Sequence, residues 1–111
     1  MTGSLHTKHC VPCEGGTPAL SLAAIEALHT QINSVWQVVD AQKLHRVWKF
    51  ADFKEAMVFV NRVAEVAEAE GHHPNIHLSW GMVKVSIWTH KIDGLTESDF
   101  VLAAKIEQLS E

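Results

Sequence analysis

The spacing of hydrophobic residues constrains this 111-residue chain most, because it alternates between the period of a helix and that of a strand. Apolar residues three or four positions apart are typical of an amphipathic helix, and they predict helices over residues 18–32, 52–70 and 96–109. β-branched and aromatic runs, or apolar residues at every second position, predict strands over residues 35–39, 44–50, 76–78 and 82–88. The predicted order is α-β-β-α-β-β-α.

This order of elements predicts the fold class. Strands joined by short turns pair antiparallel, and helices placed between such hairpins have only the sheet to cover. We therefore expect an α+β two-layer sandwich, in which a four-stranded antiparallel sheet carries three helices on one face.

The composition narrows the kind of protein further. Hydrophobic residues make up 47% and charged residues 20%, as in ordinary globular domains. No apolar run approaches the roughly 20 residues of a membrane-spanning helix, and the N-terminus lacks the pattern of a secretory signal. The net charge is −4 and the nine lysines and arginines are scattered, which argues against direct binding to nucleic acid. We expect a cytoplasmic protein that binds neither membranes nor nucleic acid.

The N-terminal 16 residues are polar and show no sustained periodicity. They predict a flexible arm over residues 1–16, followed by one domain over residues 17–111. Cys10 and Cys13 form a Cys-x-x-Cys pair, with His6 and His9 just upstream. Two thiolates and two imidazoles could hold a metal tetrahedrally, whereas the simpler interpretation is a mobile arm with reduced cysteines.

The second helix is the most clearly marked element. Asp52 and Glu55 have the spacing of a capping box, and Gly71 suits a left-handed helix end. Phe59 and Val66 widen the apolar surface beyond one stripe, from which we expect a homodimer or homotetramer built partly on this helix.

Three histidines are expected to meet at one edge of the sheet. His72 and His73 directly follow the second helix, and His90 directly follows the last strand. In an antiparallel hairpin the start of one strand lies beside the end of the other, so these imidazoles should converge. Such a cluster suits acid–base chemistry near neutral pH. The remaining histidines are interpreted as structural: His6, His9, His29, His45 and His77.

A catalytic zinc site is the competing interpretation of three histidines. Two observations argue against it. Adjacent residues such as His72 and His73 rarely point at the same ion, and the chain has no His-Glu-x-x-His sequence.

The residues around these histidines resemble the signature of the pterin-4a-carbinolamine dehydratase family. The matching stretches are Glu68-Ala69-Glu70-Gly71-His72-His73-Pro74, then Trp80, Thr89-His90 and Gly94-Leu95-Thr96-Glu97-Ser98-Asp99. The similarity extends over about residues 10–108, since the arm is similar to that of bacterial members. The combination of motifs is specific, whereas His-His-Pro alone would be weak.

The resemblance implies a dehydratase that converts 4a-hydroxytetrahydrobiopterin to quinonoid dihydropterin, recycling the pterin used by aromatic amino acid hydroxylases such as phenylalanine hydroxylase. No cofactor and no metal are implied. By motif match, His72 and His90 form the acid–base pair and His73 orients the pterin. Glu68 matches an acidic family position.

Three further residues are implied with open alternatives. Trp88 and Thr89 would flank the substrate pocket, or serve only in strand packing. Asp99 matches the signature, but it could equally act as a cap of the third helix.

The resemblance also implies a function of another class. Animal members act as dimerisation cofactors of a homeodomain transcription factor, so the alternative is a coactivator-type binding module that regulates transcription.

Overall fold

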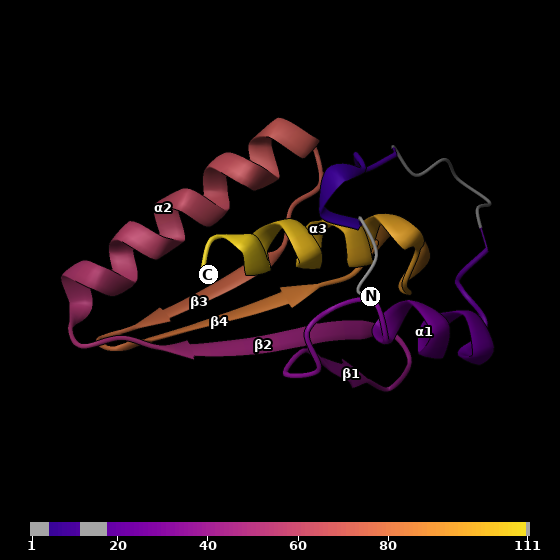
Figure 1. Ribbon diagram of the computed structural model, residues 1–111, viewed down its shortest axis with the longest axis horizontal. Coiled ribbons are helices and arrows are strands. Elements are labelled where there is room, and N and C mark those ends of the chain that lie inside the picture. Colours follow the sequence, from indigo (N-terminus) through magenta and orange to yellow (C-terminus); the bar gives the residue numbers. More distant parts are fainter. Residues whose placement is uncertain (1–4, 12–17, 111) are drawn as a thin grey trace.

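A computed structural model describes residues 5–11 and 18–110 of the chain (Figure 1). The helices are η1 (Leu5–Thr7), α1 (Leu22–His29), α2 (Phe53–Glu70), η2 (His90–Ile92) and α3 (Glu97–Gln108), where η denotes a short 3-10 helix. The strands are β1 (Gln37–Val39), β2 (Lys43–Lys49), β3 (Asn75–Ser79) and β4 (Met82–Ile87). Within the described ranges, no helix is both long enough and apolar enough to cross a membrane.

The sheet has four antiparallel strands in the order β1-β2-β4-β3. Each hairpin therefore places its second strand at the centre, and β2 pairs with β4 between the two halves of the chain. Trp80 and Gly81 form the turn between β3 and β4, as predicted. The predicted α+β class and the four-stranded antiparallel sheet are confirmed.

The helix ends follow local chemistry. The side chain of Asp52 accepts a hydrogen bond from the backbone N–H of Glu55, and Gly71 ends α2 with φ 65°. Gly71 suits this left-handed position because it carries no Cβ. The first helix is shorter than predicted: it ends at His29, and Ile32 follows in a turn while still reaching the core.

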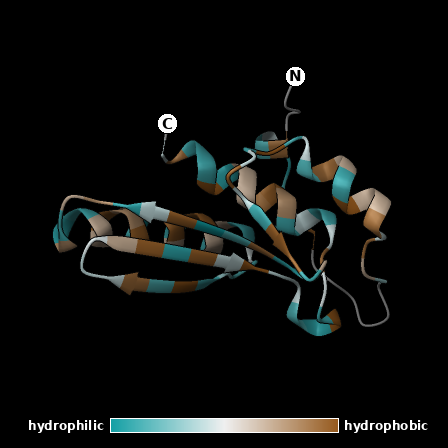
Figure 2. Cartoon of the chain, turned by 90° about the horizontal axis from the view of Figure 1, so that it is seen from below, coloured by the Kyte–Doolittle hydropathy of each residue, from teal (hydrophilic) through white to brown (hydrophobic). Residues whose placement is uncertain are grey.

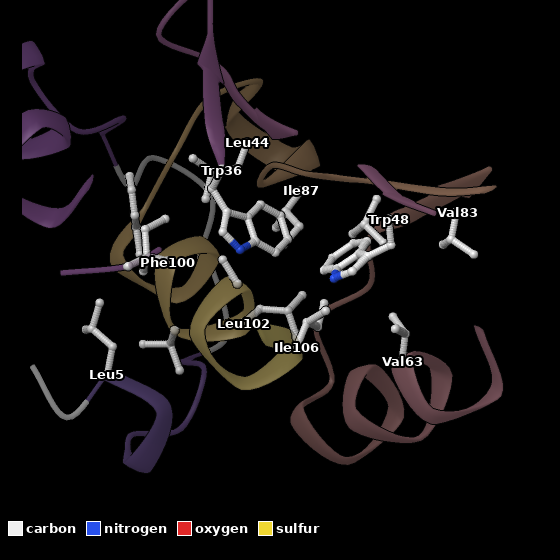
Figure 3. Close-up of a cluster of buried hydrophobic side chains, with 14 of the residues drawn as sticks. Leu5, Trp36, Leu44, Trp48, Val63, Val83, Ile87, Phe100, Leu102 and Ile106 are labelled. Carbon is white, nitrogen blue, oxygen red and sulfur yellow. The ribbon is translucent and has the colours of Figure 1, made fainter. Parts of the chain in front are cut away.

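The core lies between the sheet and the helices α2 and α3. Figure 3 shows Trp36 and Trp48 beside Phe100 and Ile106 of α3, with Val63 entering from α2. Seen from below in Figure 2, the opposite face of the sheet carries no helix, and brown and teal residues alternate along its strands. Because one face is covered and the other open, every second residue of β4 is buried.

The reason given for oligomerisation is wrong in one respect. Phe59 is 5% exposed and packs within its own chain, with ring centroids 4.7 Å from Trp48 and 5.2 Å from Phe50. Val66 is half-buried against the same core. The exposed large apolar residues of α2 are instead Phe53 and Val58. The oligomeric state itself stays a prediction.

Residues 5–11, which the sequence placed in the arm, pack against α3 in the structure. Leu5 is 2% exposed and joins the hydrophobic core. Helix α1 also contacts α3. The predicted division at residue 17 stays a prediction, because residues 12–17, and with them Cys13, lie outside the described residues.

Candidate active site

A pocket of about 260 Å³ opens where α2 and β4 end. Its walls combine the exit of α2 with the residues after β4, and they are Gly71, His72, His73, Trp88, Thr89, His90 and Lys91. The antiparallel pairing of β3 with β4 brings these two segments together. The predicted convergence of three histidines is therefore present in the structure.

His72 is held by a buried carboxylate. Its Nε2 atom lies 2.6 Å from Oδ1 of Asp99, which is fully buried, while the His72 side chain is 16% exposed. A carboxylate accepts hydrogen bonds only, so it favours the ring form with the proton on Nε2. This leaves Nδ1 as the ring atom that can take up or release a proton.

Asp99 has two further donors, which fix its orientation. Its Oδ2 atom accepts hydrogen bonds from Oγ1 of Thr89 and from the backbone N–H of Thr96, both at 2.8 Å. Thr96 and Asp99 together form the capping box of α3. Asp99 therefore acts as a helix cap, one of the two alternatives considered, with one oxygen, and it binds His72 with the other.

His90 lies exposed at the start of η2. Its ring makes an edge contact with Trp88, with centroids 4.3 Å apart. The ammonium of Lys43 lies 4.4 Å from the centre of the Trp88 ring. Trp88 thus contacts both the imidazole of His90 and a positive charge, and the rings of Trp88 and His90 line the pocket.

His73, just beyond the end of α2, forms an ion-pair contact with Glu68 in the last turn of that helix. Both side chains are more than half exposed, at 58% and 76%, so the contact stabilises the fold little. Glu68 is not among the residues that line the pocket and reaches it only through His73.

A larger hollow, of about 720 Å³, lies over the open face of β3 and β4. It contains His77 and Lys84 and is separate from the three converging histidines. Trp80, which matches the signature, is 67% exposed at the hairpin turn and does not line the histidine pocket.

The site includes residues that the sequence did not single out. Lys91 lines the pocket, although the sequence suggested no role for it. Thr96 lay in the stretch that matches the family signature and at the start of the predicted helix, yet its backbone N–H also orients Asp99. The short helix that carries Lys91 has only three residues, so no periodic pattern could signal it. Among the described residues, no group of three or more His, Cys, Asp or Glu side chains could hold a metal ion.

Known proteins are similar to this chain over most of its length. The sequence pattern of the family described as Pterin 4 alpha carbinolamine dehydratase matches residues 18–109. A protein of Rickettsia canadensis, provisionally named pterin-4-alpha-carbinolamine dehydratase, is 50% identical over 103 residues, which cover 93% of this chain and 94% of the relative.

Solved structures show the same fold. The crystal structure of a transcriptional coactivator/pterin dehydratase from Brucella melitensis superposes with a TM-score of 0.77 at 29% identity, covering 85% of this chain and all of that one. A pterin dehydratase-like protein, identified as a RuBisCO assembly factor in the alpha-carboxysome, gives a TM-score of 0.59 at 22% identity, covering 68% of this chain and 88% of that one, and shows the fold alone. Because the family pattern spans both halves of the sheet and every wall of the histidine pocket, the chain belongs to the pterin 4 alpha carbinolamine dehydratase family.

Proposed function

We propose that this protein removes water from 4a-hydroxytetrahydrobiopterin to give quinonoid dihydropterin. The observation that carries the proposal is the pocket in which three histidines converge, one of them bound to the buried carboxylate of Asp99. Membership of the family supports the substrate class.

The reaction needs one acid and one base. The bond between C4a and the hydroxyl oxygen breaks, and the oxygen takes up a proton and leaves as water. The N5 atom gives up its proton, and its electrons form the new double bond to C4a. Each molecule of substrate therefore yields one water, and no electron leaves the pterin.

Imidazoles suit both proton transfers because they gain and lose protons near neutral pH. We assign the transfers to His72 and His90, which line the same pocket, and leave open which of them donates. His73 is assigned to orienting the pterin. Trp88 and Thr89 flank the substrate, and Thr89 also holds Asp99. Glu68 acts through His73, and Asp99 acts through His72 rather than on the pterin.

This function places the protein in tetrahydrobiopterin recycling for aromatic amino acid hydroxylation, with a functional link to phenylalanine hydroxylase. A cytoplasmic location and a homodimer or homotetramer belong to the same proposal. The chemistry requires neither cofactor nor metal.

The test is a rapid spectrophotometric assay of 4a-hydroxytetrahydropterin decay, with and without purified, chelator-treated protein. We expect acceleration that survives chelation and falls by about 10²-fold or more in His90→Ala, the loss typical of a general acid or base. His77→Ala is the matched control, since His77 lies in the hollow over the open sheet face. Full activity in a folded His90→Ala variant would remove His90 from the mechanism.

A coactivator-type binding module is the second candidate, because the similar Brucella protein is described as a transcriptional coactivator/pterin dehydratase. A folded wild-type protein that does not accelerate dehydration would favour this candidate. Recovery of a transcription regulator by the His90→Ala variant in a pull-down would favour it independently.

A further inference from the structure

The segment Cys10–Val11 lies across the two backbone stretches that carry His72 and Asp99. On one side, the backbone N–H of Cys10 donates to Oε1 of Glu70 at 2.7 Å. Glu70 is the last residue of α2, two positions before His72. The segment is therefore attached to the helix end from which His72 emerges.

On the other side, the same segment is attached next to Asp99. The backbone N–H of Val11 donates to Oγ of Ser98 at 2.8 Å, and the thiol of Cys10 donates to the carbonyl oxygen of Ser98 at 3.4 Å. Ser98 is 7% exposed and directly precedes Asp99. Two adjacent residues of the N-terminal segment thus connect both halves of the His72–Asp99 pair.

Glu70 occupies a position that would be unfavourable without these partners. A carboxylate at the C-terminus of a helix faces the negative end of the helix dipole. The Glu70 side chain is 8% exposed, so water screens this repulsion poorly. Besides Cys10, it contacts Nδ1 of His9 at 3.1 Å and the ammonium of Lys105 at 3.5 Å. The local helix structure does not favour an acidic residue here, whereas the Cys10 N–H needs an acceptor at this position.

We infer that residues 5–11 form a strap that positions the His72–Asp99 pair, with Glu70 and Ser98 as positioning residues. The inference deepens the proposed function and rests on it. Besides the strap, the bond between His72 and Asp99 joins the end of α2 to the start of α3, so loss of the strap should leave this pair less constrained. Small displacements of a catalytic group reduce the rate steeply, and about 1 Å can cost about 10²-fold.

The test compares kcat and KM of the full chain with those of Glu70→Ala. We expect kcat to fall about 10- to 100-fold, with KM nearly unchanged, because the pocket walls remain. Glu70→Gln should restore part of kcat, since an amide oxygen can still accept from the Cys10 N–H. Lys8→Ala is the control: Lys8 belongs to the same segment, but its ammonium pairs with the exposed carboxylate of Glu97, at 3.5 Å, rather than with Glu70 or Ser98.

A second readout is independent of activity. The imidazole proton shared by His72 and Asp99 should give a low-field NMR resonance in the wild type, and it should broaden in Glu70→Ala but not in Lys8→Ala. If Glu70→Ala does not fold, Ser98→Ala removes the other attachment and should change both readouts in the same direction.

The possible failures are distinguishable. An unchanged kcat and an unchanged resonance in folded Glu70→Ala or Ser98→Ala would overturn the strap. A wild-type protein without dehydratase activity would instead overturn the proposed function, while the resonance would still decide whether the strap positions the pair.

Discussion

Replacing Asp99 by asparagine should abolish most of the activity while leaving the fold in place. Asparagine has the shape of aspartate, but one of its two polar atoms is an NH₂ group that only donates. The backbone N–H of Thr96 also only donates, and it lies 2.8 Å from Oδ2 of Asp99. The amide oxygen must therefore occupy the Oδ2 position, and the NH₂ group must face His72.

The consequence for His72 follows directly. Its Nε2 atom would have to accept a hydrogen bond from the asparagine, so the ring proton would move to Nδ1. The atom that now exchanges protons in the pocket would lose that ability. Because general acid–base catalysis contributes about 10²- to 10⁴-fold, we expect kcat to fall by that factor. This loss corresponds to roughly 3–5 kcal/mol of activation free energy.

The fold should lose much less. The asparagine oxygen can still accept from Thr89 and Thr96. The bond to His72 loses its charge, which costs about 1–3 kcal/mol in the free energy of unfolding. Urea unfolding measures this cost, and the dehydration assay measures kcat. Asp52→Asn is the matched control, because Asp52 caps the distant start of α2 and asparagine caps a helix equally well. A folded Asp99→Asn variant with the kcat of the wild type would refute the role of Asp99 in orienting His72.

Three further predictions concern stability and reactivity. Burial raises the pKa of the Cys10 thiol to about 12, from an ordinary 9.0. Because only the thiolate attacks, a Cys13→Ser variant, in which Cys10 is the sole thiol, should react with iodoacetamide at pH 7 about 10³-fold more slowly than a free thiol does. A reaction rate typical of a free thiol would contradict the burial of Cys10. The Cys10 N–H lowers the pKa of Glu70. Its carboxylate therefore stabilises the fold above the ordinary pKa of about 4, and this contribution disappears as the pH falls through the lowered value. In urea titrations between neutral and acid pH, Glu70→Gln should lose less free energy of unfolding than the wild type, and an equal loss in both proteins would contradict this. Phe59→Ala should cost about 3–5 kcal/mol in the free energy of unfolding, because the ring packs on Trp48, and a cost near zero would indicate that Phe59 does not contribute to the core.

The order of elements could be predicted because it depends on local periodicity. The capping pattern of Asp52 and the glycine at position 71 marked both ends of α2 correctly. The end of the first helix was less certain, because Ile32 continues the helical spacing but reaches the core from a turn. Apolar spacing does not distinguish these two ways of burying a side chain.

The sequence also could not show which neighbour an apolar side chain would bury against. Phe59 looked like excess surface on α2, yet Trp48 of β2 and Phe50, just after β2, pack against it. Similarly, the polar residues 5–11 gave no periodic signal. Cys10 and Val11 bind through backbone N–H groups, which every residue except proline carries.

The sequence by itself determined the α+β order of elements, the antiparallel hairpins and the convergence of His72, His73 and His90, since each follows from local patterns and from the geometry of a hairpin. Only the tertiary structure decided that Asp99 binds His72, and that the segment around Cys10 connects Glu70 to Ser98. These contacts join residues 27 to 88 positions apart in the chain. Their partners are chosen by the packing of α3 against α2 and η1, which no local pattern encodes.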